Sequence, residues 1–408
     1  MRPEQKRHLT LHVRDLRSRL VALVSEFVER GEPVSAFEGK LLLDVLDARL
    51  AFIESSLASE MSSAPRGPLG RLAQRLRAWT RPRIGVLRQH GPRTLSVPTS
   101  YLVGKAPEPA PVISIVTPAY GQGRFIERTM YSVLSQEYPA LEYVVQDGRS
   151  PDGTPEILSR WEPHLFAWAS EEDGGQADAI NRGFGRTSGE IMGWLNSDDL
   201  LLPGSLTYVA RYFAEHPGVD VVYGNRLLID EEDRQVGCWI LPRHDDEMLT
   251  AADYVPQETL FWRRNVWEAA GGYVDTSFSY ALDWELLLRF REVGAVFARL
   301  PRFLGAFRVH HGQKTTRLDL VGLDEVTLLR RQTHGRHLPY DEVRKRLGPY
   351  YRRHIMAHTL GRIADRRPTA RIAVRTYPPR SWPAKRQPQA PPVDLSARSA
   401  LIARSKRS

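Results

Sequence analysis

Between residues 112 and 195, short segments typical of strands alternate with segments of helical periodicity, and this alternation restricts the fold more than any other feature of the chain. Strands are expected over 112–117 (VISIVT), 141–146 (LEYVVQ), 165–170 and 191–195. Between them, apolar residues recur at helical spacing, as they do from Ile126 to Leu134. Strands that alternate with helices form a mainly parallel sheet with helices on both faces. The sequence therefore predicts an α/β domain of Rossmann-like type.

Strand and helix signals continue after residue 195. Further strands are expected near 219–223, 226–229, 235–241 and 259–263, and further helices from Pro203 to about His216 and over 281–293. The stretch 303–311 ends this region. Two more helices are expected within residues 317–367. We therefore predict one α/β domain over residues 111–316, followed by C-terminal helices over 317–367.

The two ends of the chain differ from this domain in composition. Residues 1–60 predict a helical hairpin, because two apolar stripes at helical spacing are separated by Gly31 and Pro33. The helices of this hairpin have three candidate partners: each other, the main domain, and a second copy of the chain. Residues 61–110 are rich in Pro, Gly and Arg, which is typical of a linker. Residues 368–408 predict a basic, disordered tail.

Positive charge is concentrated in two flanks. Residues 66–105 hold nine Arg or Lys and no acid, and residues 361–408 hold twelve Arg or Lys against two acids. Such flanks suit an anionic membrane surface, a nucleic acid or an acidic polymer, and solvated linkers would have the same composition. No apolar run approaches the ~18 residues that span a bilayer, and the charged N-terminus is not a secretory signal. The expected location is the cytoplasm, with peripheral attachment at the inner face of the cell membrane as the added role of the flanks.

Acidic residues follow three of the expected strands. Asp147 follows the second strand, Asp173 the third, and the pair Asp198-Asp199 the fourth. Because ligands of parallel sheets bind at the carboxyl ends of strands, these acids are expected at one edge. Carboxylates of this kind suit Mg²⁺ or Mn²⁺, which complete their coordination with substrate phosphates. Taken alone, the Asp-Asp pair would favour a helix N-terminus over a metal site, since a helix is expected to start close by, at Pro203.

Six stretches in register carry a family resemblance. They are ISIVTPAYGQGRFIERTMYSVLSQEYP, LEYVVQDGRSPDGT, EEDGGQADAINRGF, GEIMGWLNSDDLLLPGSL, GGYVDTSFSYALDWELLLR and FRVHHGQKT. In order and spacing, residues 112–311 resemble the inverting glycosyltransferases of family two, which have the GT-A fold. The resemblance implies a metal-dependent enzyme that moves a sugar from a nucleotide-diphosphate sugar to a glycan or lipid-linked acceptor, as in the synthesis of cell-surface polysaccharides.

The resemblance also implies roles for individual residues. On the nucleotide-sugar side it implies Pro118, Tyr120, Asp147, Asp173, Gly175, Gln176 and Asp198, of which Asp198 would face the donor sugar or ribose. Asp199 and His310 would bind the metal, Mn²⁺ or Mg²⁺. One departure from the family pattern is Asn196, which stands where the metal motif begins with an acid.

Asp283 falls where the family keeps its catalytic base. The acceptor hydroxyl must lose its proton as it attacks, which requires a positioned carboxylate. Asp283 is near the start of an expected helix, whose dipole would lower its pKa. Attack opposite the leaving group inverts the anomeric centre, so that one base suffices. Glu285, two residues on, is expected to be a solvated or salt-bridged acid.

Other functions fit the sequence less well. A nucleotide-sugar-binding module without turnover is the main alternative, and Asp198, Asp199 and Asp283 together argue against it. A nucleotidyltransferase would need a basic, glycine-rich loop where the chain has TPAYGQGRF, and a dinucleotide dehydrogenase would need G-x-G-x-x-G after the first strand. The single cysteine, Cys238, excludes an intrachain disulfide and a cysteine-based zinc site. For Trp262 and Trp284 the sequence allows two roles, core packing or a stacking platform for a sugar.

Overall fold

The structure is a computed structural model that describes residues 88–310, 319–364 and 369–372. The chain divides into two compact units, Met1–Arg81 and Pro82–Ser408, and every described residue belongs to the second. The helical hairpin expected over residues 1–60 therefore lies outside the described residues. In the described part, no helix is long and apolar enough to cross a membrane.

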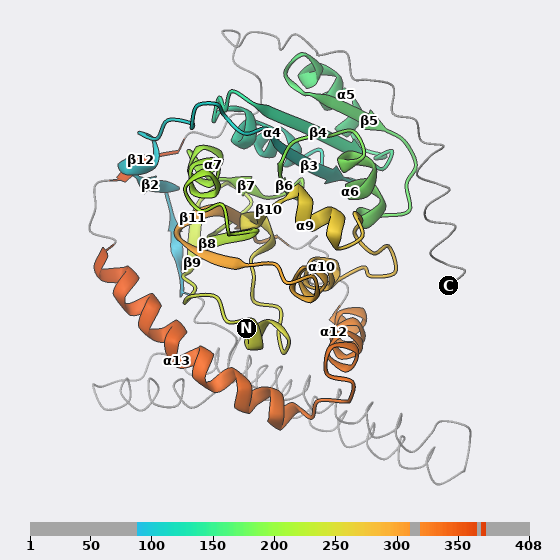
Figure 1. Cartoon of the computed structure of the whole chain (residues 1–408). Coiled ribbons are helices and arrows are strands. Elements are labelled where there is room, and N and C mark those ends of the chain that lie inside the picture. Colours follow the sequence, from blue (N-terminus) through green and yellow to red (C-terminus); the bar gives the residue numbers. More distant parts are fainter. Residues whose placement is uncertain (1–87, 311–318, 365–368, 373–408) are drawn as a thin grey trace, which may run out of the picture. The chain divides into compact units, whose positions relative to one another are not determined.

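Four parallel strands form one half of the central sheet (Figure 1). They are β3 (Ile113–Ala119), β4 (Leu141–Asp147), β5 (Ala167–Ser170) and β6 (Ile191–Trp194), in the spatial order β6-β3-β4-β5. The residues of β3 and β4 are all buried, as expected of parallel strands that helices cover on both faces. This half matches the strands expected from the sequence, with boundaries that differ by one or two residues.

The other half of the sheet is mixed. Its strands are β1 (Arg88–Arg93), β7 (Leu200–Leu201), β8 (Val221–Ile229), β9 (Gln235–Trp239), β10 (Phe261–Arg263) and β11 (Phe297–Arg308). The short β10 joins the two halves, since it pairs antiparallel with both β6 and β8. β11 pairs parallel with β8 and antiparallel with β7. The expected α/β architecture, a mainly parallel but mixed sheet flanked by helices, is confirmed.

Helices cover both faces because successive residues of a strand point to opposite sides. One face buries Ile115 of β3 under α4 (Ile126–Leu134), α5 (Thr154–Trp161) and α7 (Ser205–Glu215). The other face buries Val116 under α6 (Gln176–Phe184), and the same cluster extends to residues of α9 (Arg264–Ala269) and α10 (Leu282–Glu292).

The remaining elements complete the described part of the chain. They are β2 (Ser96–Pro98), η1 (Thr99–Tyr101), η2 (Glu162–His164), α8 (Asp246–Leu249), η3 (Gln257–Thr259), α12 (Asp319–His334), α13 (Tyr340–Ala364) and β12 (Thr369–Arg371). β1 and β2 fall within the segment expected to be a linker, yet β1 pairs with β9 in the main sheet. β12 falls within the expected tail and pairs with β2. These short strands were not predicted, because the Arg, Pro and Gly content of the segments is typical of linkers and tails.

Candidate active site

The loops that follow β3 and β4 are bound to each other around Asp147. This carboxylate is fully buried at the end of β4 and accepts hydrogen bonds from Ser150 N (3.0 Å) and Ser170 Oγ (2.6 Å). Gly121, at φ 64°, donates its N–H to Ser150 Oγ at 2.8 Å. Pro118 lies near the end of β3, and Tyr120 follows the strand with 66% of its surface exposed. Of these residues, Tyr120 is the one open to a large planar ligand.

The loop before α6 carries the next expected residues. Asp173 accepts the N–H of Gly175 at 2.8 Å, and burial raises the pKa of Asp173. Gly175 has φ 104°, a backbone conformation that residues other than glycine rarely adopt. The first residue of α6, Gln176, donates from Nε2 to Asn196 Oδ1 at 2.9 Å. The loop is thereby joined to the Asn196–Asp199 segment after β6, which we call the NSDD segment.

Two distant elements hold the NSDD segment in place. Thr129 of α4 donates its hydroxyl to the carbonyls of Ser197 (2.9 Å) and Asp199 (2.8 Å). Arg308, at the end of β11, donates from Nε to the carbonyl of Asp198 at 2.7 Å. The backbone of the two acids is therefore fixed from both sides before any ligand binds.

The side chains of the two adjacent acids have different surroundings. Asp198 Oδ2 lies 3.0 Å from His310 Nε2, with side chains that are 18% and 6% exposed. Asp199 is 1% exposed, and its Oδ1 accepts the backbone N–H of Arg308 at 2.9 Å. Burial raises the pKa of Asp199 well above its usual range, and the charge of Asp198 adds to this effect. The structure thus pairs His310 with Asp198, whereas the sequence predicts a metal site made by His310 and Asp199.

Asp283 lies in the first turn of α10. Its Oδ1 accepts the backbone N–H of Trp284 at 3.0 Å. Burial nevertheless raises the pKa of Asp283 to about 6. The expectation of a lowered pKa was wrong, because desolvation outweighs the helix dipole. Glu285 forms an ion pair with Arg289 at 2.6 Å, as the sequence reading expected.

A buried ion pair that sequence reasoning missed connects these acids. Arg226 of β8 donates from Nε to Glu258 Oε1 at 2.8 Å and from its terminal nitrogen to Oε2. Both Asp199 and Asp283 interact electrostatically with this pair. Nothing local in the sequence marks Arg226, since it stands within an ordinary strand.

The expected site residues therefore form two neighbouring groups. One group contains Asp147 and Asp173, whose charges interact, and it reaches the NSDD segment through Gln176. The other contains Asp199 and Asp283, which share Arg226 and Glu258 as electrostatic partners.

The donor set around Asp198 fits a divalent cation with few protein ligands. Within the described ranges, no group of three or more His, Cys, Asp or Glu could hold a metal by itself. A carboxylate oxygen and an imidazole nitrogen 3.0 Å apart do form a two-residue set. Mg²⁺ and Mn²⁺ sites of transferases commonly use one or two protein ligands and take the rest from phosphates. The residues present fit such an ion.

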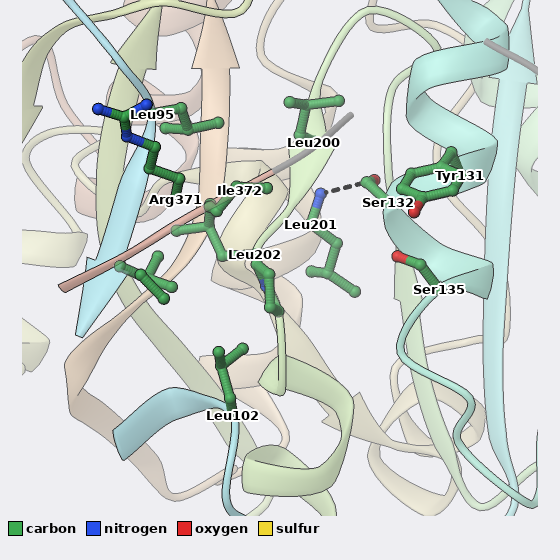
Figure 2. Close-up of a pocket in the computed structure, with 13 residues that line it drawn as sticks. Leu95, Leu102, Tyr131, Ser132, Ser135, Leu200, Leu201, Leu202, Arg371 and Ile372 are labelled. Carbon is green, nitrogen blue, oxygen red and sulfur yellow. Dashed lines mark hydrogen bonds between the residues drawn. The ribbon is translucent and has the colours of Figure 1, made fainter. Parts of the chain in front are cut away.

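A cavity of about 260 Å³ lies elsewhere, between α4, β7 and the β2–β12 pair. Figure 2 shows that leucines dominate its lining, among them Leu95, Leu102 and Leu202, with Arg371 at one side. It contains none of the expected site residues.

Trp262 and Trp284 are both fully buried. Of the two roles that the sequence left open for them, core packing and a stacking platform for a sugar, the structure therefore supports core packing.

Comparison with known proteins identifies relatives of this chain. A family model described as glycosyl transferase family 2 matches residues 114–247. An uncharacterised glycosyltransferase of Mycobacterium tuberculosis is 31% identical over 186 residues, which cover 44% of this chain and 69% of the relative. Chondroitin synthase of Escherichia coli is 29% identical over 209 residues, or 50% of this chain and 30% of that protein.

Solved structures are more distant. The S. aureus protein TarS, in complex with UDP-GlcNAc, is 18% identical and has a TM-score of 0.46, with 61% of this chain and 74% of that chain covered. A mannosyltransferase of Pyrobaculum calidifontis, in complex with GDP-Man and Mn²⁺, is 18% identical and has a TM-score of 0.45, with 82% and 86% covered. At these TM-scores, the solved structures bear on neither the ligand nor the reaction of this chain.

Proposed function

Because the chain belongs to glycosyl transferase family 2, we propose that it is a metal-dependent, inverting enzyme that moves a sugar from a nucleotide-diphosphate sugar to a glycan or lipid-linked acceptor. The observation that carries the proposal is the shared environment of two segments distant in sequence. The NSDD segment and the first turn of α10 both bring an acid to the Arg226–Glu258 pair. Synthesis of a cell-surface polysaccharide is the proposed setting, in line with relatives named chondroitin synthase and O-antigen biosynthesis protein.

For the metal we propose Asp198 and His310 as the protein ligands. Their side chains face each other, whereas Asp199 is occupied by the backbone N–H of Arg308. When bound there, Mg²⁺ or Mn²⁺ would neutralise the charge that develops on the leaving diphosphate. Asp199 is then a positioning residue, which fixes the end of β11 two residues before His310.

Asp283 is proposed as the general base. A carboxyl with a pKa of about 6 is ionised at neutral pH and is a stronger base than an ordinary aspartate. It accepts the proton of the acceptor hydroxyl as the oxygen attacks the anomeric carbon. The hydroxyl attacks from the side opposite the leaving diphosphate, so the product has inverted configuration. Because the sugar is transferred in one displacement, no covalent intermediate forms and no second carboxylate is needed.

The nucleotide is proposed to lie along the loops after β3, β4 and β5. Tyr120 offers an exposed ring for the base, and Asp147 is held rigidly by Ser150 and Ser170. Gln176 ties the Asp173–Gly175 loop to the NSDD segment, so that ordering one would order the other. Pro118 contributes the rigid end of β3.

The test is release of nucleotide diphosphate from a panel of nucleotide sugars, beginning with UDP-GlcNAc and GDP-mannose, in the presence of Mn²⁺ or Mg²⁺. Turnover that disappears in Asp283→Asn, with nucleotide binding intact, supports a transferase. Binding of a nucleotide sugar without turnover by the wild-type chain, across the whole panel and a range of acceptors, would support the inactive binding module instead.

Two further sequence predictions concern the ends of the chain. Attachment to an anionic membrane through the basic flanks, and homo-oligomers through the N-terminal helices, both rest mostly on residues outside the described ranges. Both stay predictions. Vesicle co-sedimentation with and without residues 361–408 tests the first, and the oligomeric state with and without residues 1–60 tests the second.

A further inference from the structure

Among the buried polar atoms without a hydrogen-bond partner in the described residues are Asp253 Oδ1, Gln257 Oε1 and Trp239 Nε1. The guanidinium carbon of Arg226 lies 5.5 Å from the centre of the Trp239 ring, and its charge interacts with Asp253. Its ion-pair partner, Glu258, is the next residue after Gln257. A buried polar atom without a partner is energetically unfavourable, so each one calls for an explanation.

Asp253 and Asp283 share one environment. Burial raises the pKa of Asp253 well above its usual range, and the charge of Asp283 raises it further, while Arg226 opposes both effects. Arg226 also lowers the pKa of Asp283. The two carboxyl groups therefore belong to one electrostatic cluster with a single guanidinium, although they are thirty residues apart in sequence.

The segment that carries Asp253 is tightly held. Three consecutive carbonyls just before it accept side-chain hydrogen bonds: Leu249 from Trp284 Nε1 (2.7 Å), Thr250 from His334 Nε2 (3.0 Å) and Ala251 from Arg330 Nε (2.7 Å). Trp284 is the neighbour of the proposed base, and the other two donors belong to α12. The position of Asp253 is thus fixed relative to α10.

α12 also fixes the start of α10. The carboxylate of Glu325 accepts the backbone N–H groups of Ser279 (2.7 Å), Tyr280 (2.8 Å) and Ala281 (2.8 Å). α12 lies beside α10 in Figure 1, and a single helix therefore braces both acid-bearing segments. Such rigidity is what a group that must meet a substrate atom requires.

We propose that Asp253 is a second substrate-contacting residue of the active site, whose Oδ1 accepts a hydrogen bond from a hydroxyl of a sugar ring bound beside Asp283. This inference rests on the proposed function. Sugar hydroxyls both donate and accept hydrogen bonds, so such a ligand could donate to the Asp253 oxygen and accept from the Trp239 N–H, two unpartnered atoms of residues that both interact with Arg226. The hydroxyl belongs either to the donor sugar or to the acceptor.

The test uses the full-length chain with Asp253→Leu, which keeps the side-chain size and removes both oxygens, and Asp253→Asn, which keeps one acceptor oxygen. Asp246→Leu is the matched control, since Asp246 lies in the same segment, 54% exposed, and pairs with Arg291. Asp253→Leu is expected to lower kcat/KM by ~10–100-fold, the range for a hydrogen bond to a charged group. Asp253→Asn should recover most of this loss, and Asp246→Leu should match the wild type.

Hydrolysis and transfer assays together show whether the hydroxyl belongs to the donor sugar or to the acceptor. UDP-GlcNAc and GDP-mannose serve as donors, with methyl glycosides as acceptors, and water is the acceptor when these are omitted. If the hydroxyl is on the donor sugar, Asp253→Leu lowers both hydrolysis and transfer, and it weakens binding of the sugar nucleotide but not of UDP or GDP. If the hydroxyl is on the acceptor, hydrolysis is unchanged and transfer alone falls.

Two results would overturn the inference while the wild-type enzyme is active. One is a folded Asp253→Leu variant with wild-type hydrolysis and transfer. The other is a variant that loses UDP or GDP binding to the same degree as sugar-nucleotide binding, which indicates a structural role. A wild-type chain inactive on every donor would instead refute the proposed function, and this inference with it.

Discussion

Arg226 and Glu258 form a two-point ion pair in which the Glu258 side chain is 1% exposed and that of Arg226 is 15% exposed. Two charges of this kind are costly to bury and are stable only while each satisfies the other. The pair interacts electrostatically with Asp199 and Asp283 of the candidate active site, and Arg226 also interacts with Asp253.

Removing one member of this pair should therefore be worse than removing both. Arg226→Met leaves Glu258 buried and unpaired, which is expected to cost ~3–5 kcal/mol of unfolding free energy. The double variant Arg226→Met/Glu258→Met should recover most of that stability. Urea unfolding of the two variants and the wild type measures the difference. A double variant no more stable than the single would contradict the ion-pair account.

Asp283→Asn should remove the base while keeping the shape of the side chain. Turnover is expected to fall by ~10²–10⁴-fold, the usual contribution of a general base. Affinity for nucleotide diphosphate, measured by calorimetry, should stay within a few-fold of the wild type. Glu285→Gln is the matched control, because Glu285 pairs with Arg289 and should affect stability more than turnover.

The pKa of Asp283 predicts how activity and stability depend on pH. Because its ionised form is the base, kcat/KM should fall as pH drops through about 6. The raised pKa means that the folded chain holds this proton more tightly than the unfolded chain. Its contribution to stability is thus fully present below the unfolded pKa of ~3.9 and is lost as pH rises through about 6.

Asp283→Asn should therefore be more stable than the wild type above pH 6, by at most ~3 kcal/mol, and nearly equal to it at pH 4. Thermal unfolding at both pH values gives this comparison. An acid limb of the rate profile that survives in Asp283→Asn with residual activity would assign the titration to another group.

His310→Ala should weaken the dependence on metal rather than the fold. Loss of one of two protein ligands is expected to raise the Mn²⁺ concentration for half-maximal activity by at least ~10-fold. Asp198→Asn should act in the same direction. Asp199→Asn should reduce stability more than metal affinity, since its oxygen accepts the Arg308 N–H. If Asp199→Asn weakened metal affinity more than Asp198→Asn did, Asp199 rather than Asp198 would be the metal ligand.

Gly183 gives a test of the packing of α6 on the sheet. A Cβ added there would lie 2.4 Å from Val116 Cγ1, so Gly183→Ala is expected to destabilise the fold by ~1–3 kcal/mol despite the better helix propensity of alanine. Val116→Ala should rescue it in part.

Local pattern was enough to predict the parallel half of the sheet. The strands β3 to β6 are short and rich in apolar residues, although β4 also carries Glu142, Gln146 and Asp147. Each intervening helix has its own periodicity, so period and length decide the element. The mixed half was harder. β1 carries Arg and Gly at a sheet edge, where exposure removes the apolar signal.

The candidate site was predictable where acids follow strands and not elsewhere. Asp147, Asp173 and the NSDD segment stand at strand ends, which the topology of parallel sheets brings to one edge. Arg226 and Asp253 have no such marker. Their role depends on how β8, η3 and the segment after α8 approach one another, and that is a property of the tertiary fold. The pKa of Asp283 was misjudged for the same reason, because its burial is set by residues distant in sequence.

α12 begins at Asp319, well beyond residue 247, where the match to the family model ends. Through Glu325, Arg330 and His334 it nonetheless anchors the two segments that carry Asp283 and Asp253. Substitutions along this helix are therefore expected to shift both acid-bearing segments while the nucleotide-side loops keep their form. Under the proposed function, chimeras that exchange α12 between family members would change kcat/KM although Asp283 and Asp253 themselves are unchanged.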